Sequence, residues 1–192
     1  MDDQLPMLLG RDLDAAFERL VREHQARVFS IALRLTGNAS DAEEVAQDVF
    51  MRAYRALGEY PPERIRELRL RPWLATIAVN LSRNRFRRHR PATTDLDDIA
   101  RSRAGDLAAG DRDTPHHEVA RRESTAHWQR LISALPDRYR VPLVLRYVDD
   151  LTFTEMSEVL GQPLGTLKAQ VYRGLRLLRA AHDSTERKEL SA

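Results

Sequence analysis

Apolar residues recur every three or four positions along most of this chain, and that spacing predicts amphipathic α-helices. The first pattern runs from about Asp12 to Leu35 and stops at Gly37, a residue that favours the left-handed turn closing a helix. The second starts near Ser40, with carboxylates in its first turn, where the helix dipole favours them. The buried face expected for the first helix is formed by Phe17, Leu20, Val21, His24, Val28, Ile31, Ala32 and Leu35. That of the second is formed by Val45, Ala46, Val49, Phe50, Ala53, Tyr54 and Leu57. Two such apolar stripes predict a helical bundle.

A third helix is predicted from Pro72, because proline fits the first turn, where its missing N–H would be unpaired. Its apolar stripe is Leu74, Ile77, Ala78 and Leu81. A separate polar line is formed by Thr76, Asn80, Arg83 and Arg87, with Trp73 and Phe86 at its ends. Arginines hold phosphates, asparagine can read a base edge, and an indole can stack on an unpaired base. The alternative is that Trp73 belongs to the core and the arginines are only solvated.

The segment from Phe153 to Arg179 predicts two helices around a tight turn. Gly161 ends the first helix, Pro163 blocks its continuation, and Thr166 is placed to cap the second. The buried stripe of the second is Leu164, Leu167, Val171, Leu175 and Leu178, and its other face presents Lys168, Gln170, Tyr172, Arg173, Arg176 and Arg179. No acidic residue occurs from Leu164 to Ala180, so this helix suits a major groove. An ordinary hairpin with a solvated basic face would show the same pattern.

Charge is distributed very unevenly. Nine arginines and one acid lie between Arg64 and Arg90, whereas seven acids and three arginines lie between Pro91 and Ala120. The acidic stretch has few large apolar residues and cannot bury enough surface to fold alone. The sequence therefore predicts an all-α chain: two small helical domains, 1–90 and 118–192, joined by a flexible acidic linker, 91–117. The second domain contains the helix-turn-helix, and Pro142 predicts a helix start or a kink near it.

Composition excludes several classes of protein. The 192 residues include no cysteine, which excludes disulfides and thiolate metal sites. No apolar run reaches membrane-spanning length and the N-terminus is acidic, so we expect a cytoplasmic protein without membrane insertion. There is no glycine-rich phosphate loop, catalytic constellation or metal-ligand cluster, so we expect neither an enzyme nor a cofactor. His116 and His117, adjacent in the linker, are interpreted as incidental.

Three segments in order resemble the bacterial extracytoplasmic-function (group 4) sigma factors of the sigma-70 family. They are DAEEVAQDVFMRAYRAL, RPWLATIAVNLSRNRFRRHR and, after the acidic spacer, ALPDRYRVPLVLRYVDDLTFTEMSEVLGQPLGTLKAQVYRGLRLLR. Each segment is unspecific alone, but their order is specific and the resemblance extends from about Asp14 to Arg179. It implies a factor that is not an enzyme and gives RNA polymerase its promoter specificity. The implied partners are the polymerase core (β′ clamp helices and β flap), promoter DNA and an anti-sigma factor.

The resemblance also implies roles for individual residues. Polymerase-core binding falls on Asp41, Glu44, Gln47, Asp48, Met51 and Arg52, on a face that by itself also fits a solvated surface. Recognition of the −10 element falls on Arg71, Trp73, Thr76, Asn80, Arg83, Asn84 and Arg87, with the loop from Gly58 to Arg71. Recognition of the −35 element falls on Thr166, Lys168, Gln170, Tyr172, Arg173 and Arg176. Ala169 and Gln170 replace a common serine and arginine, so the −35 sequence is not inferred.

Two other classes of protein were weighed against these features. A dimeric helical repressor would need a dimer seam or a ligand pocket, and would leave the arginines of Arg64–Arg90 unexplained. A nucleic-acid-processing enzyme would need a catalytic constellation. As a free coil the linker would span roughly 30 Å, whereas promoter elements two helical turns apart are separated by roughly 70 Å. We therefore expect the linker to be extended on DNA, and the free domains to tumble semi-independently or to close on an inhibitor.

Overall fold

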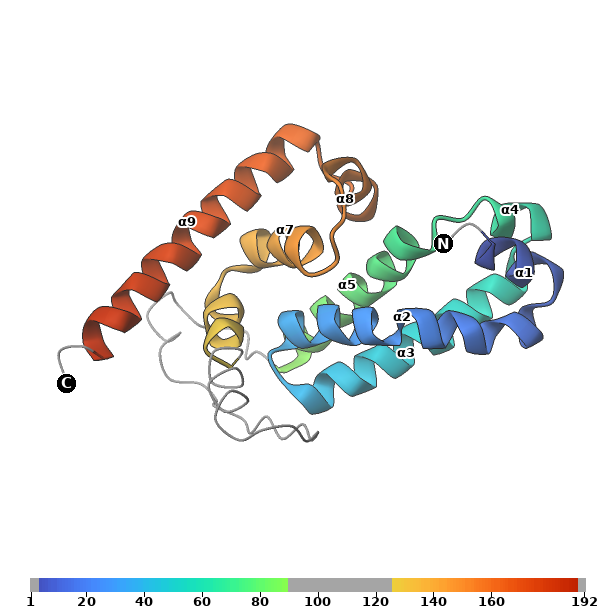
Figure 1. Cartoon of the computed structure of the whole chain (residues 1–192), viewed down its shortest axis with the longest axis horizontal. Helices are drawn as coiled ribbons and strands as arrows, with labels where there is room; N and C mark the ends of the chain where they lie inside the picture. Colours follow the sequence, from blue (N-terminus) through green and yellow to red (C-terminus); the bar gives the residue numbers. More distant parts are fainter. Residues whose placement is uncertain (1–3, 90–125, 190–192) are drawn as a thin grey trace.

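The computed structural model describes residues 4–89 and 126–189, and every regular element within these ranges is a helix (Figure 1). The N-terminal helices are α1 (Leu5–Arg11), α2 (Leu13–Thr36), α3 (Ala39–Glu59), α4 (Pro62–Arg66) and α5 (Leu70–His89). The C-terminal part consists of a helix over 126–134, then α7 (Asp137–Tyr147), α8 (Phe153–Leu160) and α9 (Leu164–Glu189). The predicted all-α fold with two helical domains is confirmed, and the predicted linker 91–117 lies outside the described residues.

Local capping residues fix the ends of α2 and α3. The Asp12 carboxylate accepts a hydrogen bond from the Ala15 N–H at 3.1 Å, and the Asn38 side chain accepts one from the Asp41 N–H at 3.1 Å. Such caps satisfy N–H groups that have no partner inside the helix. Gly37 closes α2 with φ of 76°, in the left-handed region, as predicted.

The N-terminal core forms where α2, α3 and α5 pack together, with α1 and α4 paired beside them (Figure 1). The predicted stripe of α2 is largely buried, and His24 is a core residue at 4% exposure. Tyr54 differs from the prediction because it is 42% exposed. Its ring packs edge-on against Phe17, and its hydroxyl donates to Asp14 at 2.5 Å, so it contacts the core from outside.

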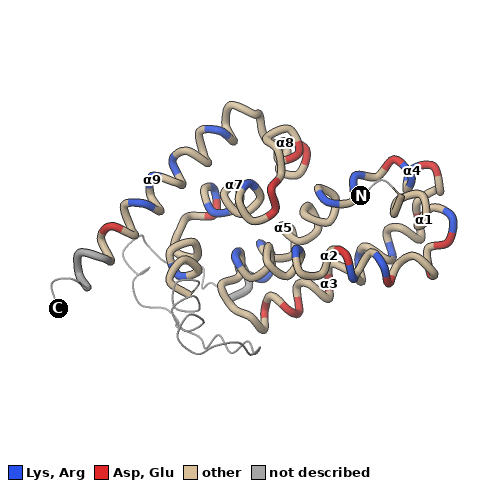
Figure 2. The backbone as a smooth tube through the Cα atoms, in the orientation of Figure 1, with Lys and Arg blue, Asp and Glu red and all other residues tan. Residues whose placement is uncertain are grey.

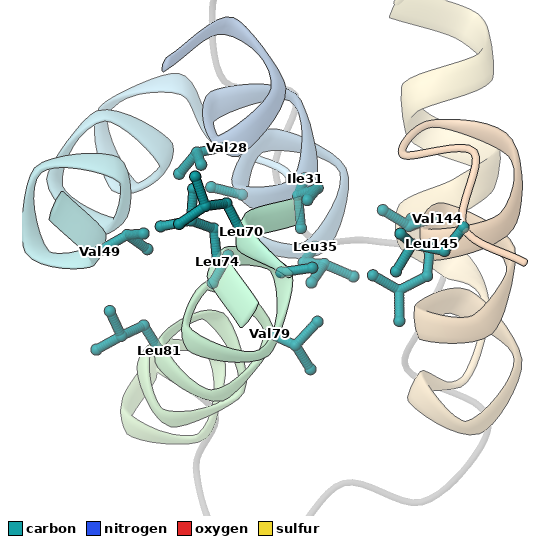
Figure 3. Packing of buried hydrophobic residues seen from close by; sticks show 14 of the residues in the cluster. Val28, Ile31, Leu35, Val49, Leu70, Leu74, Val79, Leu81, Val144 and Leu145 are labelled. Carbon is teal, nitrogen blue, oxygen red and sulfur yellow. The ribbon is translucent and has the colours of Figure 1, made fainter. Parts of the chain in front are cut away.

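Helix α5 is buried on more than the predicted stripe. Ala75, Val79 and Ser82 are also buried, whereas Ile77 is only half-buried. Helix α5 contacts α8 of the C-terminal domain in addition to α2 and α3. Figure 3 shows Leu35 between the N-terminal helices and Val144 and Leu145 of α7, and one apolar core spans both parts of the chain. This contact between the domains was not anticipated from the sequence.

The C-terminal domain contains the predicted helix-turn-helix. Helix α8 begins with a capping box between Thr152 and Glu155 and ends at Gly161, whose φ is 63°. Helix α9 begins at Leu164, so Thr166 lies inside its first turn and is not the N-cap. Leu164 is 43% exposed because it precedes the part of α9 that faces α7. Helix α7 contains Pro142 in its interior, since the helix starts five residues earlier at Asp137.

Close packing of α7 on α9 depends on Gly174. A Cβ atom at this position would lie 2.7 Å from Leu143 Cδ1 and 3.2 Å from Tyr139 Cβ. We expect Gly174→Leu to destabilise the C-terminal domain by about 1–3 kcal/mol, since overpacking forces neighbours to shift. Gly165→Ala, in the same helix with nothing within 4 Å of the added Cβ, is the matched control. Chemical denaturation followed by circular dichroism measures both, and equal stability of the two variants would contradict the packing of α7 on α9.

Candidate nucleic-acid and protein interfaces

One face of α3 is exposed and mixes acidic, amide, thioether and basic side chains. Residues three and four apart share a helix face, and this face carries the exposed Glu44, Gln47, Asp48, Met51 and Arg52, with Asp41 half-buried at one end. Met51 is 52% exposed, and the side chains around it on this face are polar or charged. The residues that were expected to contact the polymerase therefore lie together on one accessible surface.

Arg85 of α5 connects the exposed face of α3 with the polar face of α5. Its Nε lies 2.9 Å from Asp41 Oδ1, and its guanidinium lies 2.5 Å from Glu44 Oε2. Hydrogen bonds to Asp41 and then Glu44 raise the pKa of Arg85 above its usual range, although partial burial opposes them. Arg85 could not be assigned a role from the sequence, because a pair of residues 44 positions apart leaves no periodic signal.

The exposed polar residues of α5 are Asn80, Arg83 and Asn84. They lie together within about one helical turn, so an amide and a guanidinium face the same volume. Thr76 is half-buried, and its hydroxyl donates to the Pro72 carbonyl at 2.8 Å. The side chain of Arg87 lies outside the described residues. The polar line on α5 is therefore accessible mainly around Asn80.

The start of α5 is less accessible than its middle. Trp73 is half-buried against the core, with its ring centroid 6.3 Å from that of Tyr60. The Arg64 guanidinium lies over the same Tyr60 ring at 3.8 Å, so aromatic and basic groups alternate here. Arg71 is half-buried and donates to the Asp149 carbonyl at 2.6 Å. In this structure Arg71 is thus occupied by the C-terminal domain.

The outer face of α9 is basic and accessible. Figure 2 shows basic residues spaced along α9 and acidic residues gathered on α8. Thr166, Lys168, Tyr172, Arg173 and Arg176 are exposed, with Tyr172 at 65%. Gln170 differs, since it is half-buried and its Oε1 atom is buried without a hydrogen-bond partner. Its amide is therefore less available for a base edge than the sequence suggested.

Within residues 4–89 and 126–189, no group of three or more His, Cys, Asp or Glu side chains is arranged to hold a metal ion. A stretch apolar enough for a bilayer occurs in none of the described helices.

Known proteins are similar to this chain over most of its length. Residues 20–92 match the family model of sigma-70 region 2, and residues 127–178 match that of sigma-70 region 4. The ECF RNA polymerase sigma factor SigW of Bacillus subtilis is 31% identical, over 85% of this chain and 87% of its own. The RNA polymerase sigma-H factor of Pseudomonas aeruginosa is also 31% identical, over 90% of this chain and 89% of its own.

Solved structures share the fold. A chain in the structure of CnrH in complex with the cytosolic domain of CnrY matches with a TM-score of 0.69 at 22% identity, covering 95% of this chain and 97% of the matched one. A second match, with a TM-score of 0.64 at 15% identity, covers 85% of this chain and 94% of the other. It is the sigma factor RpoE with the anti-sigma factor NepR from Bartonella quintana.

The chain has a helical bundle that exposes a mixed-charge face, followed in the sequence by a helix-turn-helix with a basic second helix. This combination defines a DNA-binding transcription factor. The chain belongs to the sigma-70 family and is an extracytoplasmic-function sigma factor. Sigma factors act in transcription initiation with RNA polymerase and are not enzymes. The resemblance based on three ordered segments is therefore confirmed, and the dimeric repressor is not favoured.

Proposed function

We propose that the exposed face of α3 docks on the β′ clamp helices of the polymerase core, with the β flap as a second contact. The observation that supports this most is the position of Met51 at 52% exposure among Gln47, Asp48 and Arg52. Cores of protein interfaces are enriched in methionine and arginine, with polar groups at the rim.

We further propose that the two DNA-reading surfaces act on different forms of DNA. Helix α9 reads the intact −35 duplex through its major groove, where every base pair has a distinct donor and acceptor pattern. Helix α5 binds the −10 element once a base has left the stack, with Asn80 and Arg83 at the strand. Capture of an unstacked base offsets the few kcal/mol needed to unstack it, so melting requires no nucleotide hydrolysis.

An anti-sigma factor is the further partner that we propose. One structural relative was solved with a protein named as its anti-sigma factor. A protein bound against α3 or α9 would cover surfaces that the polymerase and DNA need. Which signal releases such a partner is a property of that partner and not of this chain.

Transcription in vitro tests the proposal as a whole. Core polymerase with the purified chain should produce transcripts from specific genomic promoters, and core polymerase alone should not. A repressor would instead bind its duplex without polymerase and yield no transcript. Sequencing the transcript starts would identify both promoter elements.

The −35 assignment makes a quantitative prediction about salt. We expect Lys168→Ala and Arg173→Ala to weaken promoter binding by the reconstituted holoenzyme before melting. Each phosphate contact removed should reduce the slope of log affinity against log salt by about one. Arg130→Ala, at an exposed arginine of helix 126–134, is the control. A slope that fell equally in all three variants would indicate a general loss of charge and not contacts made by α9.

A further inference from the structure

Helix α1 lies at one end of the N-terminal bundle, beside α4 (Figure 1). It precedes residues 20–92, which match sigma-70 region 2, so that likeness gives α1 no role. Its apolar residues Leu5 and Leu9 are buried, at 0% and 1% exposure. Among the described helices, α4 is the one against which α1 packs most extensively. Helix α1 is therefore an integral part of the bundle, placed directly against α4.

Helix α4 depends on this neighbour for its position. It has five residues, too few for a helix to be stable alone in water, and no side chain caps its N-terminus. Its buried side chain is Ile65, at 4% exposure, which belongs to the same apolar core as Leu5 and Leu9. No other described helix packs against α4 to a comparable extent. The place of α4 is therefore set by α1.

Gly10 allows α1 to approach the backbone of α4 closely. A Cβ atom at this position would lie 2.9 Å from the Pro62 carbonyl oxygen and 3.2 Å from Arg66 Cγ. Even a short C–H···O contact keeps carbon and oxygen about 3.3–3.6 Å apart. The Arg66 side chain can turn aside, but the Pro62 carbonyl moves only with the backbone of α4. Alanine at position 10 would therefore shift α4 relative to α1 by about 0.5 Å, the difference between these carbon–oxygen distances.

Helix α4 lies within the loop from Gly58 to Arg71 and contacts the aromatic groups that precede and begin α5. The Arg64 guanidinium, which belongs to α4, lies 3.8 Å from the centre of the Tyr60 ring. The centroid of that ring lies 6.3 Å from the centroid of Trp73 in α5. Arg64 is exposed and both rings are half-buried, so this array remains accessible in part. A shift of α4 therefore moves Arg64 against Tyr60 and changes the surroundings of Trp73.

We propose that α1 positions the loop from Gly58 to Arg71 for the −10 strand, and that Gly10 determines −10 specificity through its contact with α4. The inference rests on the proposed −10 function of α5 and this loop. Arginine and aromatic side chains bind unpaired bases by stacking. A binding site must hold its groups within about 0.5 Å of their productive positions. The shift that a methyl group imposes at position 10 is as large as that tolerance, so Gly10 acts on the base through α4.

Gly10→Ala in the full-length chain tests the proposal. With reconstituted holoenzyme, open complex is measured on one promoter and on derivatives that carry single base changes in the −10 element. We expect the preference for the best −10 sequence to fall by about fivefold, the low end of the discrimination that one base contact provides. Binding of core polymerase and of the −35 duplex should be unchanged, because other helices are proposed to bind them. If α1 only stabilised the fold, open complex would fall by the same factor on every sequence.

Gly165→Ala is the matched control, because it adds the same methyl group to a helix at a site with nothing within 4 Å. Both substitutions favour the helical conformation by a similar amount, and Gly165→Ala should keep the −10 preference of the parent chain. Ile65→Val removes one buried methylene from the α4 side of the contact, and it should reduce the preference in the same direction as Gly10→Ala. If Gly10→Ala does not fold, Ile65→Val decides the outcome in its place.

Trp73 reports the position of the loop without polymerase or DNA. The chain has two tryptophans, so Trp128→Phe leaves Trp73 as the single one. In that background Gly10→Ala should shift the fluorescence emission maximum of Trp73, and Gly165→Ala should not. An unchanged emission maximum would overturn the proposal, and so would a uniform loss of open complex on all −10 sequences. If the parent holoenzyme showed no −10 preference, the proposed −10 function would fail, whereas the fluorescence would still decide whether α1 positions the loop.

Discussion

Asp48→Arg should abolish stable binding to core polymerase while leaving the helical content of the chain unchanged. Asp48 is exposed on α3, and no ion pair to it occurs among the described residues. Reversal of its charge therefore leaves the core intact but places a like charge against the polymerase. Losing a charged contact within an interface costs about 2–5 kcal/mol, or roughly 30-fold or more in affinity.

The measurement is co-elution with core polymerase, followed by titration of a fluorescently labelled chain. Circular dichroism shows whether the variant remains folded. Glu18→Arg makes the same change of charge on α2 and should bind as the parent does. Unchanged co-elution of Asp48→Arg would remove this face of α3 from the proposed interface.

Asn80→Ala should impair promoter melting far more than the first binding step. The Asn80 side chain is exposed, and its amide makes no hydrogen bond to another side chain or to the backbone of the described residues, so little stability is lost. If it reads a base edge in the open strand, its removal costs about 1–3 kcal/mol, or roughly 5- to 150-fold in the amount of open complex. Permanganate footprinting of unpaired thymines measures the effect.

Gln25→Ala provides the control, because it removes an exposed amide from α2. It should leave both duplex binding and melting unchanged. Normal permanganate reactivity with Asn80→Ala would mean that α5 does not hold the −10 strand. Weak duplex binding without a melting defect would instead place Asn80 at the closed complex.

Features set by neighbouring residues were predictable from the sequence. Gly37 and Gly161 both adopt the left-handed conformation that ends a helix, and the stripe of α2 is buried. Each depends on residues within a few positions of one another, where helix geometry alone decides the outcome. The exposed faces of α3 and α9 followed as the complements of those stripes.

Features set by distant residues were not predictable in the same way. Val79 is buried in a helix that contacts the C-terminal domain as well as α2 and α3, and nothing in the period of α5 distinguishes it from a surface position. Arg71 and Asp149 are separated by 78 positions, and Arg85 and Asp41 by 44. Leu164 was expected to be buried but is exposed. It continues the apolar stripe of α9 beyond the point where α7 covers that stripe.

The bridge from Arg85 to Asp41 and Glu44 has a thermodynamic consequence for transcription initiation. It links the helix proposed to dock on polymerase with the helix proposed to hold the open strand. A partner that binds these carboxylates competes with the Arg85 guanidinium for them, and DNA phosphates attract the same guanidinium. The free energies of the two binding events are therefore coupled, and such coupling is reciprocal. If polymerase binding raises the affinity of the chain for melted DNA by some factor, melted DNA raises its affinity for polymerase by the same factor.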